Sequence, residues 1–296
     1  MLAPGVWGVV ATPFTGSALD VDEPSLARLV EHYASLGVAG LTVLGVFGEA
    51  ARLDTAERRA VLETVLDSVD LPVVVGATGL STAPVIEDVA LAAELAGPRL
   101  AGAMVQVNSG DPQVLSRHLA AVHEATGAGL VVQDYPLVSG VRVGPAALAA
   151  ALSATPGVVA VKAEAPPTTT AIATLTESLD LPVFGGLGGL GLLDELAAGA
   201  AGAMTGFSFP EGLLACVEAW RTGGYSAARE AFLPYLPLVN FEQQATVALA
   251  IRKECLRRRG LIMDAGVRPP AASLPEALRE QLHRHVTAVS TMTEVA

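Results

Sequence analysis

The feature that most constrains the fold is a regular alternation of short apolar runs with longer segments of helical periodicity. The runs lack alternating polar residues, which indicates strands buried on both faces, as in parallel sheets. Eight strand–helix repeats in about 220 residues favour closure into a (β/α)₈ barrel over an open doubly wound sheet. The predicted strands are Val6–Ala11, Gly40–Leu44, Pro72–Val75, Ala101–Val107, Gly129–Gln133, Val158–Lys162, Pro182–Phe184 and Gly202–Thr205, with helices between them such as Glu23–Leu36, Thr55–Val69 and Thr82–Leu95.

The end of the chain departs from this repeat. Helical patterns from Leu213 onward predict the last barrel helix and then further helices. We therefore expect an α/β protein with a barrel over residues 1–222 and a C-terminal helical extension over residues 223–296, packed together as one structural unit.

Charge and composition exclude several classes of partner. The net charge of −12 disfavours binding to nucleic acid or to anionic membranes. No uninterrupted apolar run approaches the roughly 18 residues of a membrane span, and the N-terminus lacks the features of a signal peptide. Cys216 and Cys255 form no disulfide or metal-binding pattern, so we expect a cytoplasmic protein. The basic cluster Arg252–Lys253 with Arg257–Arg259 is interpreted as a solvated helix face.

Lys162 closes the apolar run Gly157–Val161, which predicts a lysine at the end of a buried strand. Burying an ammonium group is costly, and burial therefore favours the neutral amine. A neutral amine attacks a carbonyl and forms a Schiff base, which draws electrons from neighbouring bonds. The alternative is a lysine that reaches the barrel rim or pairs with Glu164, and position alone leaves both open.

In a parallel barrel, the residues that act on a substrate lie where strands end and the following loops begin. The five histidines fall in predicted helices, and no His/Asp/Glu cluster of the kind that binds a metal lies at the strand ends, so neither a metal nor a cofactor is expected. The polar residues at the predicted strand ends are Thr12, Glu49, Gln106, Asn108, Gln133, Asp134, Tyr135, Lys162, Glu164 and Thr205.

Four segments carry a resemblance to a known family. They are "GVVATPFT", "GLTVLGVFGEAARLDTAER", "GVVAVKAE" and "GAAGAMTGFSFP", and they occur in the family's order and spacing. The chain resembles the dihydrodipicolinate synthase / N-acetylneuraminate lyase family of Schiff-base aldolases over about residues 5 to 290. The resemblance implies a (β/α)₈ barrel, Lys162 as the Schiff-base lysine, a small-molecule carbonyl substrate and a homo-oligomer, either tetramer or dimer.

The loop after the second strand departs from the family pattern. The family has two hydroxyl residues there, which bind the substrate carboxylate, whereas this chain has Val46 and Phe47 between Gly45 and Gly48. Backbone N–H groups of the loop could still hold an anion, although the glycines could simply make the turn. The two apolar side chains suggest a less polar substrate than pyruvate with a sugar.

The end of the fifth strand also departs from the family. Gln133 stands where the family has a proton-transferring tyrosine, and a glutamine side chain has no proton to exchange. Tyr135 lies two residues further on the same face and could replace it, or it could be a packed aromatic side chain. Asp134 points the other way unless the strand bends.

Glu164 follows Lys162 by two residues, so a continuing strand would point both into the barrel. Its carboxylate is a candidate general acid/base, or merely the partner of a salt bridge. The candidate catalytic residues are therefore Lys162, Tyr135, Glu164 and Asp134. The candidate substrate-binding residues are Thr12, Gly45, Val46, Phe47, Gly48, Gln133, Gly186, Met204 and Thr205.

These residues predict a Schiff-base lyase, an aldolase or dehydratase, acting on a 2-oxo acid or a related carbonyl compound. Lysine-pathway synthase activity is not expected, because the arginine that such synthases use for the aldehyde substrate falls at Val138. The alternative is a non-catalytic small-molecule-binding or regulatory protein on the same barrel, suggested by the loss of the tyrosine and both hydroxyls.

Overall fold

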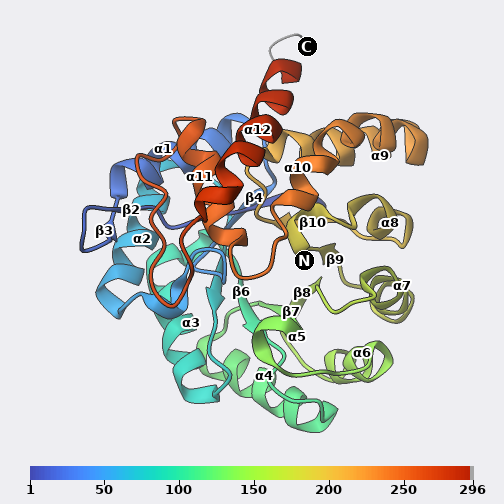
Figure 1. Ribbon diagram of the computed structural model, residues 1–296. Coiled ribbons are helices and arrows are strands. Elements are labelled where there is room, and N and C mark those ends of the chain that lie inside the picture. Colours follow the sequence, from blue (N-terminus) through green and yellow to red (C-terminus); the bar gives the residue numbers. More distant parts are fainter. Residues whose placement is uncertain (294–296) are drawn as a thin grey trace.

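The computed structural model, which describes residues 1–293, is a closed barrel of parallel strands (Figure 1). This confirms the predicted (β/α)₈ fold. Within the described residues, eight strands follow one another around the barrel in the order β1-β10-β9-β8-β7-β6-β5-β4. They are β1 (Gly5–Val9), β4 (Gly40–Val43), β5 (Val73–Ala77), β6 (Leu100–Gln106), β7 (Leu130–Asp134), β8 (Val158–Ala163), β9 (Val183–Gly185) and β10 (Gly202–Thr205).

The helices form a ring around these strands (Figure 1). Their starts follow from the sequence: the Asp54 side chain accepts from the Glu57 backbone while the Glu57 side chain accepts from the Asp54 backbone, which closes a capping box at α2. The ring comprises α1 (Glu23–Ser35), α2 (Thr55–Ser68), α3 (Thr82–Ala96), α4 (Pro112–Thr126), α6 (Pro145–Ser153), α7 (Thr168–Ser178), α8 (Leu192–Ala197) and α9 (Pro210–Phe232).

Side chains fill the inside of the barrel, so its floor is a packed core. Trp7, Val74, Met104, Phe184 and Met204 belong to one buried cluster. Because side chains alternate along a strand, their neighbours point outward and pack under the helices. The cluster fills the barrel below the strand ends, and a cavity opens at the carboxyl end of the strands.

Several short elements differ from the sequence-based expectations. β4 ends at Val43, one residue early, because Leu44 takes a left-handed conformation (φ 57) that turns the chain into the glycine loop. The small sheet of β2 (Phe14–Thr15) and β3 (Asp20–Val21) and the short helix α5 (Pro136–Ser139) were not predicted, because elements of a few residues show no periodicity.

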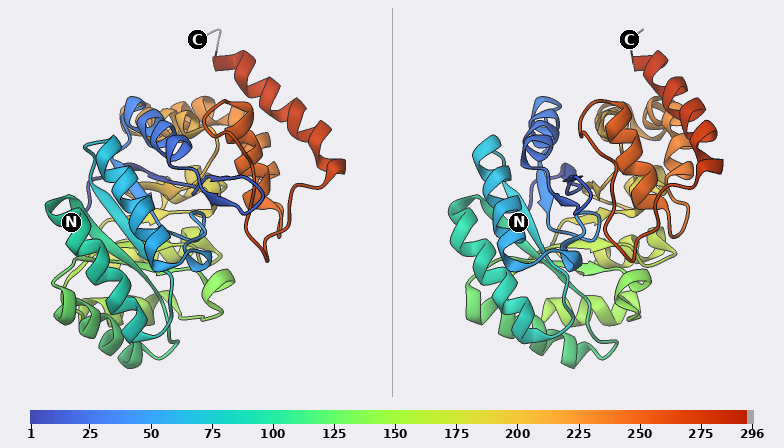
Figure 2. Two further views of the ribbon diagram at one scale, coloured as in Figure 1. Left: turned by 90° about the vertical axis from the view of Figure 1, so that its left-hand side faces the viewer. Right: turned by 60° about the vertical axis from the view of Figure 1, so that its left-hand side comes forward.

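The predicted boundary between residues 222 and 223 falls inside α9, close to a kink at Gly224 (φ 68). The extension continues through α10 (Leu236–Phe241), α11 (Ala248–Arg258) and α12 (Arg279–Thr293), and α12 packs against α10 and α11. Figure 2 shows α12 projecting beyond the barrel. Residues 294–296 of the predicted extension lie outside the described residues. No helix among residues 1–293 is long and apolar enough to cross a membrane.

Candidate active site

Lys162 lies at the carboxyl end of β8, and its side chain points into the barrel. Strand pairing places it beside Gln133 of β7 on one side and Phe184 of β9 on the other. Phe184 belongs to the inner cluster, so Lys162 shares that inward face. The lysine is buried, with 6% of its surface exposed.

Glu164 continues the same face. Its backbone N–H donates to the carbonyl of Asp134 (2.9 Å), which extends the pairing with β7 past the end of β8. One carboxylate oxygen, Oε2, lies 3.2 Å from Lys162 Nζ and accepts from Gln133 Nε2 (2.7 Å). The other, Oε1, accepts from the backbone N–H of Leu187 (3.1 Å). Gln133 therefore fixes the orientation of the carboxylate that faces the lysine.

Gly186 leaves the space that this carboxylate occupies. A Cβ at this position would lie 2.2 Å from Glu164 Oε1, far inside van der Waals contact. Any larger residue would push Glu164 away from Lys162. Gly186 thus supports the lysine–glutamate pair from the end of β9.

A cavity of about 500 Å³ opens above Lys162 and Glu164. It contains most of the candidate residues and connects the strand ends with the C-terminal extension. Of the predicted site residues, those that line it are Gly45, Val46, Phe47, Gln133, Tyr135, Lys162, Glu164 and Thr205, whereas Thr12, Gly48, Asp134, Gly186 and Met204 are not among its lining residues.

Two of the residues outside the lining have clear structural contacts. The Thr12 hydroxyl donates to the carbonyl of Gly48 (2.7 Å) and so holds the glycine loop. Met204 packs in the inner apolar cluster with Trp7. Thr205, which does line the cavity, accepts from the backbone N–H of Gly188 (2.7 Å) and fixes the loop after β9.

Tyr135 and Asp134 differ in what they face. Tyr135 lines the cavity, and burial, followed by the nearby charge of Glu164, raises the pKa of its hydroxyl. Asp134 pairs in register with Ala163, on the strand face opposite to Gln133 and Lys162. Its Oδ1 is buried with no hydrogen-bond partner among the described residues, and burial raises its pKa to about 6, with a further contribution from Glu164.

The glycine loop is anchored from below by Glu49, which takes a left-handed conformation (φ 55). The buried Glu49 carboxylate accepts from Lys253 Nζ (2.5 Å), Arg52 Nη1 (2.9 Å) and the backbone N–H of Arg268 (3.0 Å). Within residues 1–293, the backbone N–H groups of Val46 and Phe47 donate to no protein acceptor. They are free to hold a substrate anion at the cavity wall.

Sequence analysis missed the cavity residues contributed by the extension. Arg252 and Gln243 line the cavity, together with Arg52 from the helix-like turn after the glycine loop. The interpretation of Arg252–Lys253 as a solvated helix face is wrong, because Lys253 is fully buried and the Arg252 side chain is only 12% exposed. Charged residues next to each other on a helix give no local sign that they face a distant cavity.

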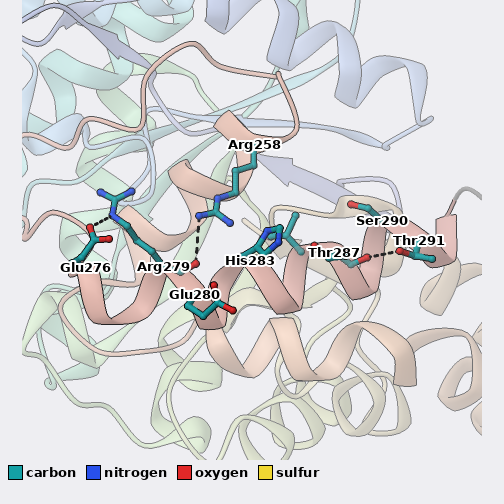
Figure 3. A pocket seen from close by; sticks show the side chains of 9 residues that line it. Arg258, Glu276, Arg279, Glu280, His283, Thr287, Ser290 and Thr291 are labelled. Carbon is teal, nitrogen blue, oxygen red and sulfur yellow. Dashed lines mark hydrogen bonds and ion pairs between the residues drawn. The ribbon is translucent and has the colours of Figure 1, made fainter.

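A second, wider groove of about 830 Å³ runs along α12 (Figure 3). Its two arginines are already paired, since Arg258 Nε donates to Glu254 (2.9 Å) and Arg279 Nε contacts Glu276 (2.7 Å). It offers no buried lysine among its lining residues. Across the part of the chain that the structure describes, no three His, Cys, Asp or Glu side chains come close enough to hold a metal ion.

The fold and the site place this protein among the parallel-barrel proteins that carry a buried lysine beside a carboxylate at the end of one strand. The model of the dihydrodipicolinate synthetase family matches residues 3–289, and the chain belongs to this family. This confirms the predicted family.

Individual relatives agree with that assignment. The chain is 30% identical to L-2-keto-3-deoxyarabonate dehydratase of Azospirillum brasilense, over 94% of this chain and 92% of the relative. It is 29% identical to a 4-hydroxy-tetrahydrodipicolinate synthase of Methanothrix thermoacetophila, over 98% of both chains. The crystal structure of dihydrodipicolinate synthase from Rhodopseudomonas palustris superposes with a TM-score of 0.89 and 33% identity, covering 97% of each chain. The prediction of a lyase is confirmed at the level of the family.

Proposed function

We propose that the protein is a class I lyase that forms a Schiff base between Lys162 and a 2-oxo acid. The observation that carries this proposal is the position of Lys162, buried at a strand end and facing a closed-bottomed cavity, with the Glu164 carboxylate 3.2 Å from its Nζ. A buried amine next to a proton acceptor is the arrangement that nucleophilic attack on a carbonyl needs.

The reaction follows from these groups. Glu164 takes a proton from Lys162, and the neutral amine attacks C2 of the oxo acid to give a carbinolamine. A proton returned to its hydroxyl lets water leave, which produces the iminium. Loss of a proton from C3 then gives an enamine, and Glu164 is the carboxylate within reach of Nζ for these transfers.

Val46 and Phe47 take part through their backbone. Their free N–H groups would hold the substrate carboxylate, replacing the missing hydroxyls. Tyr135 lines the same cavity and is a second candidate for proton transfer. Asp134 lies on the other face of β7, so it would influence the reaction only through the effect of its charge on Glu164.

Two outcomes are open. The enamine can expel the C4 hydroxyl group, which leaves as water once it is protonated, and this is a dehydration. Alternatively, the iminium loses the proton of its C4 hydroxyl instead of a C3 proton, the C3–C4 bond breaks with release of an aldehyde, and the enamine remains on the lysine; this is a retro-aldol reaction. The name of the Azospirillum relative is that of a dehydratase of a keto-deoxy sugar acid, which supports the first outcome and a 2-oxo acid substrate. The predicted homo-oligomer, either tetramer or dimer, and the predicted cytoplasmic location stay predictions.

The test is reductive trapping. The protein is incubated with pyruvate or another 2-oxo acid, reduced with borohydride, and analysed by intact mass and peptide mapping. We expect one adduct, on Lys162, that disappears in Lys162→Ala. A folded protein that binds the oxo acid equally well with and without Lys162, and gives no adduct, would instead be the non-catalytic binding protein.

A further inference from the structure

We propose that Arg252, Arg52 and Gln243 form a second anion-binding subsite in the cavity, which selects 2-oxo acids that carry another carboxylate at the end distant from the carbonyl. This inference rests on the proposed function, because it assigns the far end of a substrate whose oxo group reacts with Lys162. The subsite predicts a substrate with a charged end group. The sequence alone had suggested a less polar substrate, because Val46 and Phe47 are apolar.

Arg252 is held rigidly with its donors available. Its Nε donates to Glu242 Oε2 (3.3 Å), and its guanidinium carbon lies 5.5 Å from the centre of the Phe47 ring. Glu242 is itself fully buried and accepts from the Ser208 hydroxyl, so the anchor is fixed. The two terminal nitrogens of Arg252 bind no protein acceptor within the described residues. A planar guanidinium with two free nitrogens suits a carboxylate, which it binds through two parallel hydrogen bonds.

Gln243 brings a further donor to the same place. Its Nε2 is buried and has no hydrogen-bond partner in the part of the chain described. A Cβ built on Gly188 would lie 1.9 Å from Gln243 Nε2 and 2.7 Å from Arg252 Nη2, so the two donors converge above this glycine. Buried donors are nearly always satisfied in native proteins, so the unpaired Gln243 Nε2 beside Arg252 Nη2 points to an acceptor supplied by a ligand.

The charge of the cavity wall favours a second anion. Among the described lining residues, Arg52, Lys162 and Arg252 are cationic and Glu164 is the one carboxylate. Glu49, the partner of Arg52, is shared with Lys253, so Arg52 is not fully neutralised. A cationic cavity in a chain with a net charge of −12 concentrates anionic ligands against the field of the whole protein. Glu242 pairs with Arg252 through Nε, and a second carboxylate would bind the terminal nitrogens that this contact leaves available.

The experiment compares two five-carbon acids, 2-oxoglutarate and 2-oxopentanoate, which differ in a terminal carboxylate against a methyl group. Each is titrated against the full-length protein, and the Lys162 adduct is trapped with borohydride and quantified by intact mass. We expect 2-oxoglutarate to reach half-saturation at a concentration roughly tenfold lower or more. In Arg252→Gln this preference should fall to about one, whereas Arg252→Lys should keep part of it.

Controls separate this inference from the proposed function. Arg221→Gln removes an exposed arginine of α9 that pairs with Glu218, and it should keep the full preference. Pyruvate, which has no far end, tests the Schiff-base function by itself, and Arg221→Gln should form the pyruvate adduct as well as the wild type. If the wild type forms the pyruvate adduct but shows no preference between the two longer acids, the subsite is wrong and the Schiff-base function stands. If no oxo acid forms an adduct, both are wrong. The wild-type comparison decides the matter even if Arg252→Gln fails to fold.

Discussion

The protein contains two buried lysine–glutamate pairs with different surroundings. Lys162 and Glu164 lie 3.2 Å apart at the end of β8 and both line the cavity. Lys253 and Glu49 lie 2.5 Å apart between α11 and the glycine loop, and both side chains are fully buried. Lys253 Nζ also donates to the carbonyl of Gly266 and lies 4.1 Å from the centre of the Phe14 ring. Neither Lys253 nor Glu49 lines the cavity.

The comparison teaches that burial and a carboxylate partner do not by themselves make a lysine a nucleophile. Burial lowers the pKa of Lys253 to about 8, against the opposing effect of Glu49, yet no carbonyl compound can reach its amine. Lys162 Nζ pairs with Glu164, and the lysine lines a cavity that a carbonyl compound can enter. Lys253 therefore holds the glycine loop, and the accessible Lys162 is the lysine for which we propose the chemical role.

The titratable groups nearest the two pairs also differ. Asp134 and Glu195 are carboxyl groups whose pKa values are raised first by burial and then by the charge of Glu164, Glu195 to about 7. Arg52 and Arg268, by contrast, surround the pair of Lys253 and help to lower its pKa. The first pair therefore has two buried carboxyl groups with raised pKa values behind the cavity lining, whereas the second pair is flanked by two arginines.

The largest expected effect distinguishes the two glutamates in catalysis. Glu164→Gln keeps a side chain of the same shape but cannot take a proton, so we expect kcat to fall by about 10²- to 10⁴-fold. Steady-state kinetics with the substrate identified by trapping would measure this. Glu49→Gln is the matched change at the other pair. It should mainly lower the free energy of unfolding, with a smaller effect on the kcat of the protein that remains folded. A loss of less than about threefold in Glu164→Gln would exclude Glu164 as the proton carrier.

The next effect distinguishes the two lysines in stability. Lys253→Met leaves Glu49 buried without its closest cation, and removal of one partner of a buried pair costs about 3–5 kcal/mol in the free energy of unfolding. Lys162→Met should cost much less, because Glu164 keeps its bonds to Gln133 and Leu187 and faces the cavity. Urea unfolding of both variants beside the wild type measures the difference. Equal losses would show that the two pairs have the same structural role.

The smallest expected effect concerns Asp134, a buried carboxyl group near Lys162. The pKa of Asp134 rises from 3.8 to about 6 on folding, so the folded state holds its proton more tightly than the unfolded chain. The resulting stability is fully present below about pH 4 and is lost as the pH rises through 6. Asp134→Asn removes this loss and should be more stable than the wild type at pH 8 by about 3 kcal/mol.

Thermal unfolding between pH 4 and pH 8 tests this expectation, with the exposed Asp70→Asn as control. The difference between Asp134→Asn and the wild type should grow with pH, whereas the Asp70 variant should follow the wild type. A difference independent of pH would mean that Asp134 does not titrate in this range.

The sequence by itself determined the architecture and the position of the lysine. Apolar runs without alternation, separated by helical periodicity, are local patterns, and they predicted the barrel and placed Lys162 at a strand end. The two-residue spacing of Lys162 and Glu164 likewise placed both on one face, because side chains alternate along a strand.

The tertiary structure decided what surrounds that lysine. Arg252 and Gln243 come from the extension, far from β8 in the chain, and only packing brings them over the cavity. Gln133 looked like the loss of a tyrosine, but across the strands it orients Glu164. Arg252 and Lys253 are adjacent in the sequence, yet one lines the cavity and the other is sealed beneath the glycine loop. Local patterns specify strands and helices, whereas the convergence of side chains from separate elements depends on how those elements pack.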